Sequence, residues 1–201
     1  MNTKNIDLEI FNCNKCPEAA KYRAYPMPGF YGNKCYNNLA IVAQNPGLPN
    51  EKQKSKIYKF EEIYDDYIDG LKISPIGEFL LKILPIDFKY IFYSNVVKCA
   101  FPSQYPIDFE TEFCKPYLMR QLEITKPRII ICLGAIALRA FRPGSSLTKC
   151  SLAYLRDSEY TIFPIFHPSY LNKLSTEEAL KYINQAKEKL ARLVGEITLA
   201  E

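Results

Sequence analysis

The sequence lacks several features that define large classes of proteins. None of its apolar runs approaches the roughly 18 residues that a membrane-spanning helix needs, and the longest, around Ile129–Leu133, has the length of a strand. The first residues, MNTKNIDLEIFNC, contain no apolar stretch of the signal-peptide kind. We therefore expect an intracellular, cytoplasmic protein with no membrane association.

Motifs of common enzyme classes are missing as well. The chain has no phosphate-binding loop, no G-x-G-x-x-G and no G-x-S-x-G, which argues against the nucleotide-binding and serine-hydrolase families that carry them. Tryptophan is absent and histidine occurs once, at His167. A single histidine is a candidate for catalysis, because its imidazole can donate or accept a proton near neutral pH.

The composition is that of a globular protein, with 48% hydrophobic and 24% charged residues. Its 201 residues correspond to about one domain, so we expect a single domain over residues 1–201. The net charge of +4 permits an acidic partner such as nucleic acid without requiring one. The lysines we consider for phosphate contact are Lys98, Lys115, Lys149, Lys173 and the Lys52–Lys59 stretch.

Strand-like and helix-like patterns alternate along the chain. Near-continuous apolar runs predict strands buried on both faces of a parallel sheet, at Leu39–Ala43, Tyr90–Val97, Arg128–Leu133 and Thr161–Phe166. One-sided apolar patterns predict helices at Ile76–Leu84, Asp108–Ile124, Gly134–Phe141 and after Ser175. This order predicts an α/β fold, a three-layer α/β/α sandwich with a central, mostly parallel, four-stranded sheet.

One stretch does not fit this alternation. Residues Leu48–Gly70 are polar, first lysine-rich and then acidic, and they read as a long loop with a short helix around Phe60–Ile68. A loop of this length in a compact domain is often functional.

Polar residues follow several of the predicted strands. Gln44 and Asn45 follow the first strand, Asn95 lies late in the second, and His167 follows the last. Ligands of open α/β sheets bind at the carboxyl ends of strands, so Asn45, Asn95 and His167 are expected to meet in one crevice. Each could instead be an ordinary turn or buried polar residue. The amide of Asn45 could hold a water, and the amide of Asn95 could donate to and accept from the edge of a heterocycle. His167 could donate a hydrogen bond to an oxygen on which negative charge develops.

Seven cysteines are unusual for a cytosolic chain, and an odd number cannot pair completely in disulfides. Cys13 and Cys16 form a C-x-x-C pair, and Cys99 and Cys114 would complete a four-thiolate metal site. Spacing alone does not separate zinc from a [4Fe–4S] cluster, since both accept four thiolates. The other three cysteines, Cys35, Cys132 and Cys150, are expected to be bystanders.

Several ordered motifs resemble those of the uracil-DNA glycosylase superfamily, and most closely its family 4, the iron–sulfur enzymes. They are the Cys13-x-x-Cys16 pair, IVAQNPG (Ile41–Gly47), SNVVKC (Ser94–Cys99), the Cys114-Lys-Pro-Tyr-Leu segment and FHPSYL (Phe166–Leu171). The resemblance extends over nearly the whole chain, from about Phe11 to Leu193.

The resemblance implies a role for each matching residue. Asn95 would bind the uracil edge, and His167 would stabilise the departing uracil at its O2. The cysteines would hold a [4Fe–4S] cluster, and the residues that would contact DNA are Ser169, Tyr170 and Leu171. The implied activity is DNA repair: the enzyme flips out a deaminated base, most simply uracil, and hydrolyses its N-glycosidic bond to leave an abasic site. Single- or double-stranded uracil-containing DNA is the implied partner, and a monomer is expected.

The first motif departs from family 4, which has glutamate and alanine where this chain has Gln44 and Asn45. Asn45 resembles the mismatch-specific family, in which an asparagine positions the attacking water, and Gln44 resembles family 1. We expect Asn45 to hold the water, more weakly than an aspartate would, and Gln44 to contact base or backbone. The aromatic that stacks on uracil would be Tyr58 or Phe60.

Three alternatives remain at this level. The substrate could be another deaminated base, such as hypoxanthine or xanthine, or mismatched uracil. The chain could also be a non-catalytic DNA-binding protein of the same fold. Finally, it could be a zinc-stabilised α/β domain with an unrelated small ligand.

Overall fold

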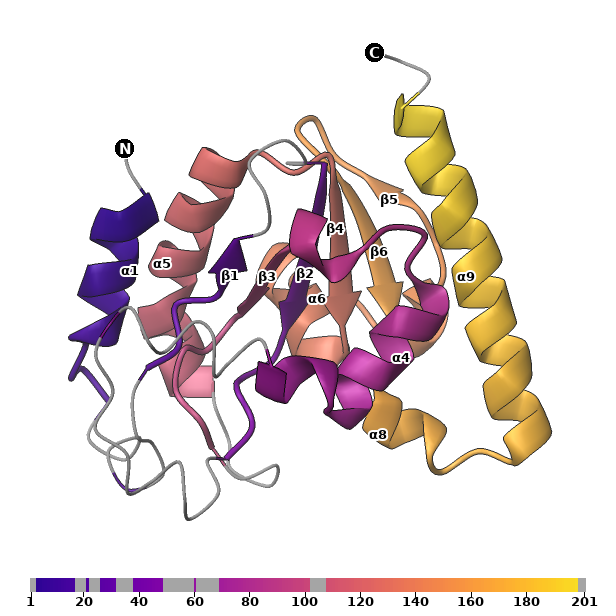
Figure 1. The fold of residues 1–201 in the computed structure, drawn as a ribbon, viewed down its shortest axis with the longest axis horizontal. Helices are drawn as coiled ribbons and strands as arrows, with labels where there is room; N and C mark the ends of the chain where they lie inside the picture. Colours follow the sequence, from indigo (N-terminus) through magenta and orange to yellow (C-terminus); the bar gives the residue numbers. More distant parts are fainter. Residues whose placement is uncertain are drawn as a thin grey trace.

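The computed structural model of the chain describes residues 3–16, 21, 26–31, 38–48, 60, 69–101 and 108–198. Its centre is a six-stranded sheet with the strand order β1-β3-β2-β4-β6-β5 (Figure 1). The inner pairs are parallel, while the two outermost strands pair in the antiparallel sense. The strands are β1 (Phe30–Tyr31), β2 (Leu39–Ala43), β3 (Phe92–Asn95), β4 (Ile129–Leu133), β5 (Leu155–Arg156) and β6 (Thr161–Ile165).

The four strands expected from the sequence form the parallel centre, which confirms the mostly parallel α/β class. The expected number of four is too low, because β1 and β5 extend the sheet at both edges. Each of these strands has two residues, too few for an alternating pattern to be recognised. β3 is shorter than expected at its start, because residues Phe88–Tyr90 form a 3-10 turn, η2.

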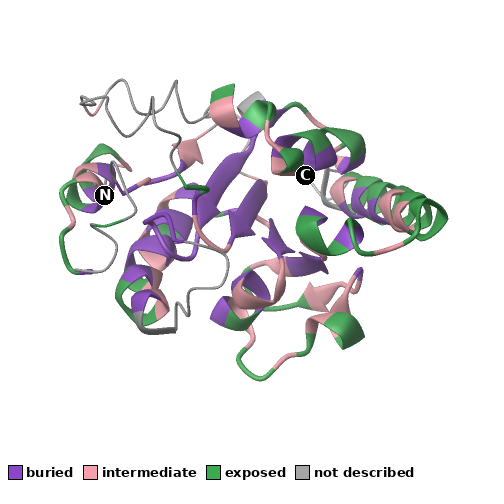
Figure 2. Ribbon diagram, turned by 90° about the horizontal axis from the view of Figure 1, so that it is seen from below, coloured by how far each residue is buried: buried purple, intermediate pink, exposed green. Residues whose placement is uncertain are grey.

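Helices cover both faces of the sheet, as a three-layer sandwich requires. α4 and α9 pack on one face and α5 and α6 on the other, while α1 lies against α5. Figure 2 shows the buried strands as the middle layer between partly exposed helices. The helices are α1 (Thr3–Phe11), α4 (Pro75–Ile83), α5 (Asp108–Thr125), α6 (Ala135–Phe141), α7 (Leu147–Cys150), α8 (Pro168–Leu171) and α9 (Thr176–Thr198).

The side chains at the helix starts explain where two helices begin. At α9, the Ser175 backbone N–H donates to Glu178 Oε2 (2.9 Å), and the Glu178 N–H donates to Ser175 Oγ (3.3 Å). This reciprocal pair is the capping box that the sequence predicted. At α4, Ser74 Oγ accepts from the Gly77 N–H at 3.1 Å, and Pro75 occupies the first helical position, where its fixed φ is favourable.

Most of the polar stretch Leu48–Gly70 lies outside the described residues, and so does the short helix expected around Phe60–Ile68 apart from Phe60 itself. Within the described part of the chain, no helix has the length and apolar character needed to cross a membrane.

Candidate active site

The residues after the parallel strands meet at one edge of the sheet. Ala43 at the end of β2 pairs with Asn95 at the end of β3, and the end of β4 pairs with the end of β6. The Gly134 N–H donates to Ile165 O at 2.9 Å, and Gly134 has a φ of +91°, which favours glycine. The turn after β4 therefore lies beside His167, the second residue after β6.

A pocket of about 480 Å³ opens at this edge, and we call it the edge pocket. Asn45 and His167 line it together, as the sequence predicted. Asn95 is 1% exposed and is not among the described residues that line the pocket. The lining residues are Asn45, Pro46, Gly47, Leu48, Gly70, Leu71, Ser74, Pro75, Ile76, Tyr93, His167, Pro168, Ser169 and Asn172.

Sequence reasoning missed Tyr93 as a pocket residue. It is the aromatic side chain among the described lining residues, and it lies on β3 two positions before Asn95. Side chains two apart on a strand share a face, so Tyr93 and Asn95 lie on the same side of the sheet. That alternation was the available signal, but an aromatic inside an apolar run reads first as core, and Tyr93 is indeed 2% exposed.

His167 has a defined tautomer. Its Nδ1 accepts a hydrogen bond from the Ser169 backbone N–H (3.2 Å) and lies 2.8 Å from Ser169 Oγ. A backbone N–H can only donate, so Nδ1 carries no proton and the neutral ring keeps its proton on Nε2. Burial lowers the pKa of His167. At neutral pH the side chain is therefore a neutral donor through Nε2–H.

Asn45 is held by two carbonyl groups. Its Nδ2 donates to Pro46 O (2.8 Å) and to Phe101 O (3.3 Å). Two acceptors around one amide end identify that end as the NH2 group. The side-chain oxygen is then the atom with which Asn45 can bind a donor such as water.

The other residues predicted to contact the base, Gln44, Tyr58 and Phe60, are not among the described residues that line the edge pocket. Gln44 is half-buried, and its backbone carbonyl accepts from the Val97 N–H at 2.9 Å. Phe60 packs edge-to-face against Phe11 at the end of α1, with ring centroids 5.7 Å apart. Tyr58 lies outside the described residues. Neither Gln44 nor Phe60 is among the described lining residues.

The segment predicted to contact DNA forms the short helix α8. Ser169 is exposed, and Tyr170 is 40% exposed and stacks on Phe166 with ring centroids 4.4 Å apart. Leu171 is 6% exposed and belongs to the core under α4 and α9. The DNA contact expected from Leu171 stays a prediction, and it would require the side chain to leave the core in which it packs here.

A second hollow, of about 650 Å³, is also lined by His167. Its lining includes Arg139, the hydroxyl residues Ser145, Ser146 and Thr148, and the exposed Tyr170. Guanidinium and hydroxyl groups are common donors to phosphate oxygens. His167 thus lines both the edge pocket and this donor-rich hollow.

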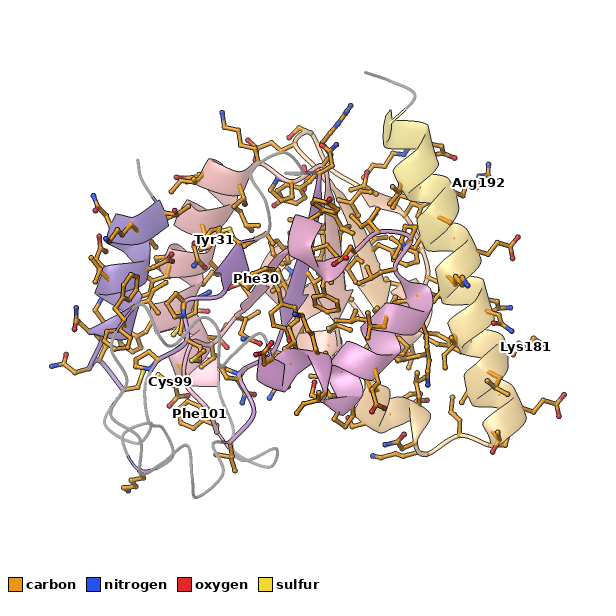
Figure 3. All side chains as sticks on the ribbon, viewed as in Figure 1. Phe30, Tyr31, Cys99, Phe101, Lys181 and Arg192 are labelled. Atoms are coloured by element: carbon orange, nitrogen blue, oxygen red, sulfur yellow. The ribbon has the colours of Figure 1, made fainter. Side chains whose placement is uncertain are left out.

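The four cysteines predicted as ligands, which we call the cysteine corner, fall in two clusters: Cys16, Cys99 and Cys114 lie in one and Cys13 in another, from which it still affects the pKa of Cys16 and Cys114. Cys13 is half-buried and the other three are buried, and Cys16, Cys99 and Cys114 share their cluster with Phe101. Figure 3 shows Cys99 next to Phe101 below β1. Within the described parts of the chain, no three His, Cys, Asp or Glu side chains are arranged to hold a metal ion.

The cysteine thiols influence one another electrostatically. Burial, and to a smaller extent the charges of Cys114, Cys99 and Cys13, together raise the pKa of Cys16 to about 12. Burial also raises the pKa of Cys114. Cys16 and Cys114 therefore resist deprotonation unless a cation is bound, because burial and neighbouring charge both disfavour a thiolate. Cys132, inside β4, has its pKa raised by burial alone.

Fold and site together define the class of this chain as a doubly covered α/β domain that binds its ligand at the ends of parallel strands. The family description "Uracil DNA glycosylase superfamily" matches residues 30–191. The chain therefore belongs to the uracil-DNA glycosylase superfamily.

Several curated relatives extend over most of the chain. A Type-4 uracil-DNA glycosylase of Pyrobaculum aerophilum is 33% identical over 182 residues, 84% of each chain. Type-4 uracil-DNA glycosylases of Sulfurisphaera tokodaii and Saccharolobus solfataricus are each 28% identical, over 83% and 82% of this chain and 74% and 76% of their own. The resemblance to family 4 drawn from the motifs is confirmed.

Proposed function

We propose that this protein is a uracil-DNA glycosylase, which takes a flipped-out uracil into the edge pocket and hydrolyses its N-glycosidic bond. The observation that carries the proposal is that Asn45 and His167, from the ends of β2 and β6, line one pocket. A base must leave the duplex to enter such a pocket, at a cost of a few kcal/mol. The names of the relatives support uracil as the base.

His167 would stabilise the leaving base. Breaking the N-glycosidic bond leaves negative charge on uracil, and Nε2–H of a neutral imidazole can donate to the oxygen where that charge develops. The Nδ1 contact with the Ser169 N–H (3.2 Å) supports this role, because it keeps the proton on the outward nitrogen. A donor oriented before the reaction needs no reorganisation during it.

Asn45 would orient the attacking water. Its Nδ2 is engaged by Pro46 O and Phe101 O, so its oxygen is the atom available to accept a hydrogen bond from water. An amide oxygen is a weak base and cannot take the proton as a carboxylate can. We therefore expect slower excision than in an enzyme with a carboxylate in the same place.

Asn95 would read the base from the end of β3. Its amide can donate and accept at once, which matches the paired donor and acceptor on the edge of uracil. The tight pairing of Asn95 with Ala43 and the burial of Asn95 favour a fixed orientation. Tyr93, on the same face, offers an apolar surface for the base, which makes it a better candidate for the stacking role than Phe60.

DNA would lie across the donor-rich hollow next to His167. Arg139 and the neighbouring hydroxyl groups suit phosphate oxygens, and Ser169 and Tyr170 are exposed beside them. Phosphate contacts of this kind make binding salt-dependent.

The cysteine corner would hold a [4Fe–4S] cluster. Its donor set fits, because four thiols are the usual ligands of such a cluster and the three buried ones pack in one cluster with Phe101. A four-iron cluster is wider than one metal ion, so its ligands need not be as close as those of a zinc ion. Hydrolysis transfers no electrons, so the cluster would serve structure by joining the segment after α1 to Cys99 and to Cys114 of α5.

A panel of oligonucleotides tests the activity. Each carries one uracil, hypoxanthine, xanthine or thymine, in single strands and in matched and mismatched duplexes, and strand breaks are counted after alkali treatment. We expect breaks at uracil and none at thymine. The second candidate function is excision of a wider range of deaminated bases, which Asn45 favours because family 4 has an alanine in its place. Strand breaks mainly at hypoxanthine or xanthine would support this second candidate. A protein that binds these strands without any excision would overturn both.

Metal analysis tests the cofactor separately. Protein purified without oxygen should be brown and carry about four iron atoms per chain, the content of a [4Fe–4S] cluster. Colourless protein that contains zinc would contradict the cluster and leave the glycosylase proposal intact.

A further inference from the structure

Lys98 is a lysine in the core. It is 1% exposed, although sequence reasoning had placed it on the DNA-binding surface, and that expectation is wrong. A buried amine is costly unless its hydrogens are bonded. Here the Nζ donates to Ser94 Oγ (2.7 Å), Asn95 O (2.8 Å) and Gln121 Oε1 (2.8 Å). Burial lowers its pKa to about 7, yet either protonation state can donate to Asn95 O.

The acceptor Gln121 is itself held from several sides. Its Nε2 donates to Pro28 O (2.7 Å), Tyr31 Oη (2.9 Å) and Asp7 Oδ1 (3.2 Å), and the Tyr31 hydroxyl donates to Asp7 Oδ1 (2.9 Å). The network therefore runs from the end of β3 through α5 to α1 and β1. Asp7 and Gln121 are buried as well.

This network reaches the proposed base-reading residue. The Lys98 contact fixes the carbonyl of Asn95, and on the next residue the Val96 N–H donates to Ala43 O (2.9 Å). The chain is thus held on both sides of the Asn95 peptide. Apolar side chains often replace buried charged groups at no loss of stability, so stability alone does not explain a lysine here.

We propose that Lys98 is a positioning residue for base recognition: through the Asn95 carbonyl, and supported by Gln121 and Asp7, it fixes the direction in which Asn95 presents its amide. The inference rests on the proposed function, in which Asn95 binds the base. It makes α1, which lies outside the edge pocket, part of the machinery that reads the base.

A double-mutant cycle tests this role with Lys98→Met, Asn95→Ala and the double variant, and with Lys181→Met on the exposed face of α9 as the matched control (Figure 3). Three quantities are measured: single-turnover excision of uracil, inhibition by free uracil, and affinity for a duplex with a tetrahydrofuran abasic site, which offers no base to Asn95. Misplacing a positioned group costs about 10²-fold. Lys98→Met should lower excision and weaken uracil inhibition by about that factor, with abasic-site affinity unchanged.

The cycle separates positioning from general stability. If Lys98 acts through Asn95, Lys98→Met costs nothing further in the Asn95→Ala background, whereas independent effects add. Additive losses, or unchanged inhibition by uracil, would overturn the inference. If Lys98→Met does not fold, the variant Ser94→Ala is measured in its place, because it removes one acceptor of Lys98. Inhibition by uracil that is weakened, though less than expected for Lys98→Met, supports the positioning role. Unchanged inhibition by uracil refutes that role. Wild-type protein that excises no uracil refutes the proposed function instead.

Discussion

The edge pocket and the cysteine corner meet at Phe101, but their side chains differ in how far they are buried. Asn45 and His167 are half-buried and face a pocket, whereas Cys16, Cys99 and Cys114 are buried around Phe101. This difference fits the proposed roles, since groups that act on a base must be accessible to the base and to water, whereas thiols that held a cluster would be protected by burial. The two regions touch where Phe101 O accepts from Asn45 Nδ2 (3.3 Å).

The largest effect is expected in the cysteine corner. Cys114→Ser should lose most of the bound iron and lower the melting temperature sharply, because metal-binding free energy is also folding free energy. Cys150→Ser, at a half-buried thiol outside the corner, should keep both. Iron content and thermal unfolding measure the pair. An equal iron content in Cys114→Ser and Cys150→Ser would show that Cys114 is not a ligand of the cluster.

The next effect is expected in the edge pocket, without loss of the fold. His167→Ala should reduce single-turnover uracil excision about 10²–10³-fold, the usual cost of removing one donor to a developing negative charge. Iron content and melting temperature should stay near those of the wild type, in contrast to Cys114→Ser. Arg192→Ala, on the exposed side of α9 (Figure 3), serves as the control. An unchanged excision rate in His167→Ala would remove this residue from the mechanism.

A smaller effect is expected at Asn45, where the two regions meet. Asn45→Ala should slow excision about tenfold, the value of one hydrogen bond. Asn45→Asp would place a carboxylate oxygen near Pro46 O and Phe101 O, at the sites of the present 2.8 and 3.3 Å contacts. These carbonyls repel the charged form and raise the pKa of the new carboxyl.

The gain from a stronger base in Asn45→Asp should therefore grow as the pH rises and be absent in acid. This pH dependence is measured by comparing the excision rates of Asn45→Asp and the wild type from pH 5 to about 9, which spans the ordinary histidine pKa and a raised carboxyl pKa. A rate ratio independent of pH would contradict the geometry of Asn45.

The smallest effect concerns folding stability near the histidine. Burial lowers the pKa of His167 in the folded state, so the unfolded chain takes up a proton first as the pH falls below about 6.5. Stability should accordingly be complete above that pH and decline below it. Urea unfolding of the wild type and His167→Ala across this range tests the sign. The free energy of unfolding of the wild type should fall more than that of His167→Ala as the pH is lowered. An equal fall in both proteins would mean that other groups cause the pH dependence of stability.

The sequence predicted well what depends on long local patterns. β2 has the predicted bounds, and β4 differs only at Arg128, because five consecutive buried residues leave a clear apolar run. Asn45 and His167 were expected at one edge of the sheet because they follow such runs, and both line the edge pocket. β1 and β5 were missed because a strand of two residues is too short to show an alternating or continuous apolar pattern.

The remaining features depend on contacts between distant segments. Lys98 was misassigned because a lysine is usually exposed, and because its acceptor Gln121 lies 23 positions away in the sequence. The burial of Leu171 was not predicted, since the motif suggested exposure while α8 turns the side chain into the core. Tyr93 was overlooked because pocket and core aromatics look alike in a strand.

Release of free uracil from a single-uracil duplex tests the central claim most directly. Excess protein is mixed with the duplex, and the released base is quantified alongside the abasic sites formed in the strand. We expect one free uracil for each abasic site, no release of thymine, and a rate that falls about 10²–10³-fold in His167→Ala. Stable binding of the duplex with no uracil released, or equal release by His167→Ala, would contradict it.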